Sequence, residues 1–214
     1  MLGEVVAWLA DNRQAFEAAA GRHLLLSATA LVAAIAMALP LALVLVRWQR
    51  LAGVAIASVN VLRTIPSLAL LAAMLPLIGT GFLPSVIALT LYGLPAILIN
   101  TYTALREVDP DIVEAGLGQG MTERQLMRRI KLPLALPVIF AGIRTAAVQI
   151  VSAATLAAFI GGGGLGELIT AGMGTLDMPQ LVLGGLAVAA LAVATELAFA
   201  LAERTVRHAV GSAA

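Results

Sequence analysis

The chain has 214 residues, of which 61% are hydrophobic and 12% are charged, and its mean hydropathy is +1.00. Ordinary soluble domains hold about 45–50% apolar and about 25% charged residues, so this composition indicates an integral membrane protein. Thirteen basic and twelve acidic residues leave a net charge of +1, which argues against a nucleic-acid partner, and the lack of cysteine excludes disulfides and thiolate metal sites.

Residues 1–22 mix apolar and polar side chains in a pattern that predicts an amphipathic helix at the membrane interface. An uncharged stretch over 24–46 follows. It has the roughly 20 residues that cross a 30 Å hydrocarbon core. The stretch ends at Arg47, Trp48 and Arg50, and an aromatic side chain beside two arginines is typical of a cytoplasmic boundary. We therefore expect an N-terminal interfacial or periplasmic segment and then a first span.

The second apolar segment covers 51–78 and contains Arg63 and Pro66. Proline removes a backbone donor, and a charge inside a membrane must reach water, headgroups or a polar partner. We therefore predict a kinked or broken helix, with Arg63 either extending to the interface or serving the transport pathway. A third span is expected over 83–103, with Pro95 near its middle.

The segment 109–133 is the one polar, charge-dense island of the chain. Asp109 is predicted to cap a short helix whose first residue is Pro110, a position where the missing N–H of proline costs nothing. A glycine turn over 118–120 is expected to close this helix.

A second short helix is predicted in the same island. Thr122 and Gln125 have the three-residue spacing of a capping box. Leu126 and Ile130 are four residues apart, so we expect them to share one face. This helix is predicted to run to Leu132 and to stop before Pro133.

The fourth span is expected over 137–160 and the fifth over 181–201, with Glu196 inside it. Between them, 161–180 is predicted to form a glycine-rich reentry or loop. Residues 204–214 are left as a cytoplasmic tail. Span boundaries predicted in this way are accurate to about two to four residues.

Basic residues in the loops predict the orientation, because they gather on the cytoplasmic side. With the island inside, nine basic residues share its side and only Arg13 and Arg22 lie opposite. The N-terminus is then outside and the C-terminus cytoplasmic. The nine are Arg47, Arg50, Arg106, Arg124, Arg128, Arg129, Lys131, Arg204 and Arg207.

A recognisable pattern lies in the island, formed by Glu114, Ala115, Gly116, Gly120, Ile130, Lys131, Leu132 and Pro133. It resembles the EAA loop of the permease subunits of bacterial binding-protein-dependent ABC importers. Gly116 stands where the motif has alanine, which is expected to weaken the local helix by about 0.5–1 kcal/mol.

Four further motifs extend the resemblance from about His23 to Glu203 and point to the osmoprotectant branch of that family, whose members import glycine betaine, choline or carnitine. They are Thr64-Ile65-Pro66-Ser67, Asn100-Thr101-Tyr102, Ala141-Gly142-Ile143-Arg144-Thr145-Ala146 and Gly163-Gly164-Leu165-Gly166.

The resemblance implies a type I ABC importer permease fold: an all-α integral membrane domain over 23–203 with five transmembrane helices and a cytoplasmic coupling-helix loop at about 109–133, between the third and fourth spans. It also implies the partners. These are two copies of an ABC ATPase subunit that binds ATP and magnesium, a second permease chain that is identical or paralogous, and a periplasmic or lipid-anchored solute-binding protein. The chain itself is expected to be no enzyme, to bind no cofactor or metal, and to lie in the bacterial cytoplasmic (inner) membrane.

In the family this loop docks into a cleft of the ATPase. The resemblance implies an ATPase-coupling interface made of Glu114, Ala115, Gly116, Gly120, Met121, Arg124, Leu132 and Pro133. We expect Glu114 to be the charged contact and Gly120 to permit a close backbone approach. The alternative is a solvated loop whose arginines only obey the charge rule of membrane topology or touch anionic lipid.

Polar residues inside the spans are candidates for the translocation path or a gate: Thr64, Pro66, Ser67, Asn100, Tyr102, Arg144, Gly163 and Gly164. Hydrogen bonding between helices is the structural alternative for Asn100 and Tyr102, and also for Glu196. His23 and His208 flank the spans and are expected at the interface, not on a metal.

Gly161, Gly163 and Gly166 satisfy a dinucleotide-binding spacing, but they follow an apolar helix and not a strand, so we reject that function. Two interpretations stay open for this loop, a flexible external gate or turn and glycine for close packing.

No phosphate-binding loop is present, so ATP hydrolysis is expected on another subunit. The predicted function is the permease subunit of an ATP-driven osmoprotectant importer. The alternatives are a permease for another small solute such as an amino acid, a secondary transporter driven by an ion gradient, and a membrane scaffold. Aromatic residues make up 4% of the chain and form no visible cage for a quaternary ammonium group, which favours recognition by a separate binding protein.

Overall fold

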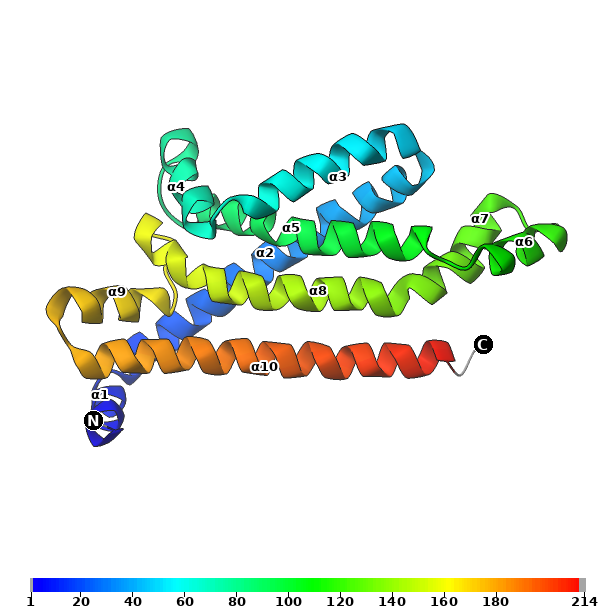
Figure 1. Cartoon of the computed structure of the whole chain (residues 1–214). Helices are drawn as coiled ribbons and strands as arrows, with labels where there is room; N and C mark the ends of the chain where they lie inside the picture. Colours follow the sequence, from blue (N-terminus) through cyan, green and yellow to red (C-terminus); the bar gives the residue numbers. More distant parts are fainter. Residues whose placement is uncertain (1, 212–214) are drawn as a thin grey trace.

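The computed structural model describes residues 2–211, and over these every regular element is a helix (Figure 1). Residues 212–214 of the predicted tail and the side chains of Arg207 and His208 lie outside the described part. The helices are α1 (Leu2–Asp11), α2 (Arg13–Arg47), α3 (Gln49–Thr64), α4 (Ser67–Ile78), α5 (Phe82–Arg106), α6 (Pro110–Gly118), α7 (Glu123–Leu126), the π-helical turn η1 (Met127–Lys131), α8 (Leu132–Ala154), the 3-10 turn η2 (Thr155–Ile160), α9 (Gly166–Thr175) and α10 (Met178–Gly211).

Four helical segments are long and apolar enough to cross a membrane, namely Arg13–Arg47, Phe82–Arg106, Glu123–Ile160 and Met178–Val206. The pair α3 and α4 also passes this test, but its two helices meet at 99°. The described chain therefore has four spans, or five if the bent pair counts as one.

The break predicted at Pro66 is confirmed, because α3 ends at Thr64 and α4 begins at Ser67. Ile65 between them is extended, with φ −77° and ψ 123°. A proline ring clashes with a helical residue before it, which drives that residue out of the α conformation.

The core lies along α5, which packs against α2 on one side and α8 on the other. Ala30, Ala34, Ala38 and Ala42 form a fully buried stripe on α2 at four-residue spacing. Small side chains of this kind let helices approach closely inside a membrane. Of the most apolar part of α5, 61% is buried, against 11% for α10, so α10 is a peripheral helix.

The short helices are divided between the two ends of the helical bundle (Figure 1). α6 and α7 lie at the end that holds the turn between α2 and α3 and the C-terminus, while α1, α9 and the N-terminus lie at the opposite end. The helix predicted over 1–22 is divided, because α1 ends at Asp11 and α2 begins at Arg13. The predicted loop over 161–180 contains the helix α9.

The predicted stop before Pro133 is wrong, because the helix continues without interruption from α7 through η1 into α8. Pro133 lies in the first turn of α8. It cannot donate a bond to the carbonyl four residues earlier, and its ring would clash there in a regular α-helix. The π-helical turn just before it bonds Leu132 N–H to Met127 O, five residues back, and this wider turn accommodates the proline.

We expect Gly142→Val to destabilise the protein by about 1–3 kcal/mol, the usual cost of overpacking. A Cβ at Gly142 would lie 2.8 Å from Asn100 Cβ and 3.0 Å from Ala96 O, so α5 and α8 would have to separate. Gly53→Val is the matched control, since a Cβ there meets nothing within 4 Å. Thermal unfolding of the purified variants in detergent tests this, and equal melting temperatures for both would contradict the packing argument.

Candidate functional site

The first helix of the polar island begins as predicted. Asp109 caps α6, because its Oδ1 accepts a hydrogen bond from Asp111 N–H at 2.9 Å, and Pro110 occupies the first helical position. α6 ends at Gly118, and Gly120 has a φ of +79° that favours glycine. A Cβ on Gly120 would meet no atom of this chain within 4 Å, so the outer side of the turn is open.

The second helix has the predicted capping box. Gln125 N–H donates to Thr122 Oγ1 at 3.3 Å, and Thr122 N–H donates to Gln125 Oε1 at 2.8 Å. Both bonds use backbone N–H groups that the start of a helix would otherwise leave without a partner. The start of α7 is therefore fixed by its own residues.

Gly116 joins the two helices of the island. A Cβ there would lie 2.9 Å from Leu126 Cδ1 and 3.0 Å from Ile130 Cδ1, and Gly116 is buried. The shared face predicted for Leu126 and Ile130 is confirmed, because both side chains rest on this one residue. The sequence-based prediction for Gly116 concerns only a weaker helix and omits this packing role. The available signal is the apolar pair Leu126 and Ile130, ten and fourteen residues later.

The outer surface of the island is charged. A shallow depression of about 400 Å³ is lined by Thr122, Arg124, Gln125, Arg128 and Arg129. Among the described residues, no group of three or more His, Cys, Asp or Glu side chains could hold a metal ion. This surface can therefore offer a partner shape, hydrogen-bond donors and positive charge.

The candidate pathway residues other than Arg144 lie in three separate places. Thr64, Pro66 and Ser67 form the break between α3 and α4. In the second half of α5, Asn100 Nδ2 donates to Ala96 O of its own helix at 2.7 Å, and Tyr102 packs half-buried against the core. Gly163 and Gly164 make up the third place, at the opposite end of the bundle from the island.

The glycine loop after η2 is closely packed. A Cβ on Gly163 would lie 2.8 Å from Arg22 Cγ, and one on Gly164 would lie 3.0 Å from His23 Nδ1. The Arg22 guanidinium stacks on the Phe82 ring at 4.5 Å and donates to Gly162 O at 3.3 Å. These contacts favour close packing as the reason for the glycines.

His23 is fully buried among the helices, and its predicted depth at the membrane interface stays a prediction. Its Nε2 lies 3.0 Å from Val151 O, and its ring rests against Gly164. The glycine loop leaves room for this ring. The contact joins two segments far apart in the sequence, so the local pattern around His23 does not predict it.

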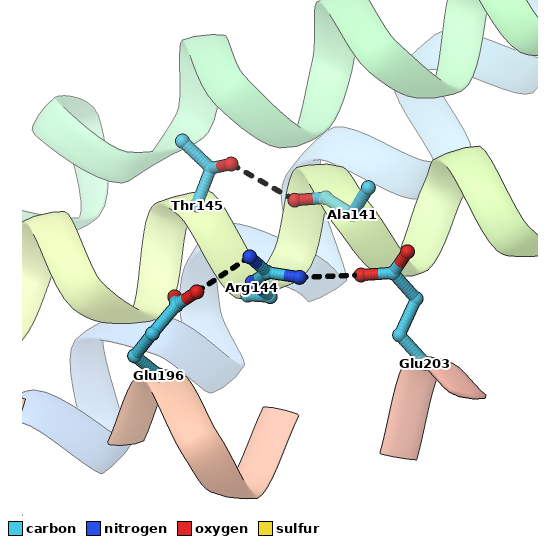
Figure 2. Close-up of polar contacts among 5 residues, drawn as sticks. All are labelled: Ala141, Arg144, Thr145, Glu196 and Glu203. Atoms are coloured by element: carbon cyan, nitrogen blue, oxygen red, sulfur yellow. Dashed lines mark hydrogen bonds and ion pairs between the residues drawn. The ribbon is translucent and has the colours of Figure 1, made fainter. Parts of the chain in front are cut away.

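Arg144 forms a polar triad with two acids of α10 (Figure 2). Its Nη2 lies 2.5 Å from Glu196 Oε1, and its Nη1 donates to Glu203 Oε2 at 2.9 Å. The side chains of Arg144 and Glu196 are 35% and 40% exposed, and that of Glu203 is 9% exposed. Arg144 and Glu196 are separate candidates in the sequence, and Glu203 is not among the predicted residues. The available signal is the seven-residue spacing of Glu196 and Glu203, which places both acids on one helix face.

Comparison with known proteins gives one matching family model, "Binding-protein-dependent transport system inner membrane component", over residues 30–208. The chain is 44% identical to the choline transport system permease protein OpuBB of Bacillus subtilis, over 85% of this chain and 84% of the relative. It is 40% identical to the glycine betaine/carnitine/choline transport system permease protein OpuCB of the same organism, over 96% and 94%. It is also 40% identical to the osmoprotectant import permease protein OsmW of Salmonella typhimurium, over 89% and 91%.

Two solved structures share the fold. The inward-facing MetNI methionine ABC transporter matches with a TM-score of 0.80 and 22% identity, over 89% of this chain and 95% of that chain. An amino acid ABC transporter with histidines matches with a TM-score of 0.79 and 19% identity, over 92% and 96%. At this identity the likeness concerns the fold and not the solute.

We expect Arg144→Gln to lower the unfolding temperature of the protein, because the change removes the cation that Glu196 and Glu203 share. Changing Glu196→Gln and Glu203→Gln in the same molecule also removes the two negative charges and should recover part of the loss. Unfolding temperatures in detergent measure both.

Thr145→Val is the control for that series, since the Thr145 hydroxyl donates only within its own helix in Figure 2, to Ala141 O at 2.9 Å. It should leave the unfolding temperature nearly unchanged. A triple variant no more stable than Arg144→Gln alone would show that the triad does not hold α8 and α10 together.

Proposed function

Because the chain belongs to the family of binding-protein-dependent transport system inner membrane components, we propose that it is the permease subunit of an ATP-driven importer of osmoprotectants such as choline, glycine betaine or carnitine. It is a transport subunit and not an enzyme. Relatives that are 40–44% identical over most of its length bear the names of osmoprotectant permeases, which favours this solute class over amino acids.

The observation that carries the mechanism is the unbroken helix Glu123–Ile160. In our proposal, 109–133 is the cytoplasmic coupling loop, and an ATPase subunit binds α6 and α7. Movement of α7 is then passed through η1 into α8, because the three form one continuous helical segment with no non-helical linker. Arg144 ties α8 to α10, so both spans move as a pair.

The contact with the ATPase is proposed to involve the exposed outer residues of the loop. Glu114, Ala115 and Arg124 are exposed, and the open side of Gly120 permits a close approach. Gly116 is buried between the helices, so its contribution is to hold them together. Met121, Leu132 and Pro133 are half-buried and complete the proposed interface.

A second permease chain, identical or paralogous, is proposed to complete the pathway together with two ATPase copies. The half-buried side chains of Arg144 and Glu196 support this. A charge within a span must reach water or a polar partner, so this face of α8 and α10 is better suited to a water-lined path or a protein partner than to lipid. We propose five spans in each chain, with the bent pair of α3 and α4 counted as one, the N-terminus outside and the C-terminus cytoplasmic.

Solute selection is proposed to rest mainly with a periplasmic or lipid-anchored binding protein. A quaternary ammonium group is held by open aromatic faces. Tyr92 and Tyr102 instead pack against the core, and Phe82 is covered by Arg22. Of the candidate path, Thr64 and Pro66 are exposed. Half-buried are Ser67, Asn100, Tyr102 and Arg144, and buried are Gly163 and Gly164.

Reconstitution tests the function. The chain, its ATPase and its binding protein in liposomes should take up labelled choline, glycine betaine or carnitine only with ATP inside, because the chain lacks a nucleotide site. Omitting the ATPase subunit is the control. Uptake that persists without it and follows an ion gradient would overturn the proposal.

Glu114→Lys tests the coupling loop. The exposed carboxylate is proposed to face the ATPase, so reversing its charge should weaken ATPase binding at least about tenfold while membrane insertion is retained. Glu107→Lys is the matched control, as Glu107 is exposed in the same region but lies outside both helices. Co-purification of the ATPase with each variant measures the effect, and normal assembly with Glu114→Lys would show that the contact lies elsewhere.

A further inference from the structure

A second hollow lies beside the coupling loop, where the end of α2 faces α6 and η1. It is a groove of about 670 Å³. Its apolar wall is built from four elements: Leu43 and Val46 of α2, Val113 and Leu117 of α6, Leu126 of α7, and Met127 of η1. Leu43 and Leu117 are 41% and 49% exposed, so much of this wall is uncovered in the single chain.

The groove lies at the level of the membrane surface. α2 is an apolar span whose last residue is Arg47, and Trp48 directly after it is 60% exposed. An arginine and an exposed tryptophan at the end of a span mark the headgroup region. Leu43 is one helical turn inside Arg47, so the apolar wall begins at the depth of the acyl chains.

Four cations line the same groove, against one carboxylate. They are Arg47, Arg124, Arg128 and Lys131, and the carboxylate belongs to Glu123. Among the side chains that the structure describes, none of the four cations forms an ion pair. Their charge is therefore available to a ligand.

We propose that this groove binds an anionic phospholipid of the cytoplasmic leaflet. The acyl chains would lie on the apolar wall, and the phosphate group would be held by the cations above it. A basic cluster directly cytoplasmic of a span attracts anionic lipid by about fivefold in affinity for each charge. Glu114 does not line the groove, whereas Arg124 lines it and also belongs to the proposed ATPase contact, so the test changes Arg47 and Lys131, which that contact does not include. The proposal is independent of the transported solute.

The test uses the full chain in lipid nanodiscs with spin-labelled phosphatidylglycerol or phosphatidylcholine. Wild-type protein should immobilise phosphatidylglycerol in preference to phosphatidylcholine. Arg47→Gln and Lys131→Gln together should lower that preference, by about fivefold for each lost charge. Arg63→Gln with Arg204→Gln is the control, because it removes two exposed arginines outside the groove. If the double groove variant fails to fold, Arg47→Gln alone is used.

The expected result is a loss of preference in the groove variant and its retention in the control. An equal loss in both would assign the preference to overall charge and overturn the proposal. So would an unchanged groove variant, or displacement of phosphatidylglycerol by added ATPase subunit, which would identify the groove as a contact between subunits. None of these readouts requires transport, so the outcome is separable from the proposed function.

Discussion

The backbone bond from Leu132 N–H to Met127 O is the constraint that joins the polar island to the membrane-spanning part of the structure. It spans five residues where an α-helix spans four, and it makes room for Pro133. In a regular α-helix, the ring of Pro133 would clash with the carbonyl four residues earlier and kink or break the helix. With the wider turn, the short capped helix α7 is the first part of the segment Glu123–Ile160. The shape of the loop and the direction of a transmembrane span are thereby fixed together.

Glycine residues, which have no side chain, determine how closely several of the helices pack. Gly116 lets α6 rest on Leu126 and Ile130, and Gly142 lets α8 rest on Asn100 and Ala96 of α5. Inside a membrane, lipid is as apolar as leucine, so close contact between helices supplies much of the association that hydrophobic burial supplies in water. The polar triad adds a directional link at the periphery, where α10 has little buried surface.

The features that sequence predicted well are the local ones. The cap at Asp109, the capping box at Thr122 and the break at Pro66 each depend on residues within four positions, and all three are found. The contacts that were not predicted join residues far apart. Gly164 of the glycine loop packs against the buried His23, and the partners of Arg144 lie on another span. The prediction of a stop before Pro133 is wrong for a different reason. The π-helical turn before Pro133 accommodates the proline, and the composition of the segment gives no signal for this rare turn.

The two connections of the island to the membrane are unequal, and this asymmetry sets the route of any movement. On one side, α5 ends at Arg106 and α6 begins at Pro110, so a non-helical linker of residues 107–109 separates them. On the other side, α7 passes into α8 with no non-helical residue between them. A linker can absorb a displacement through its backbone dihedral angles, whereas a continuous helix transmits it. In the proposed mechanism, a push on α6 and α7 therefore reaches α8 first. It then reaches α5, which packs against α8, and α10, which Arg144 links to α8.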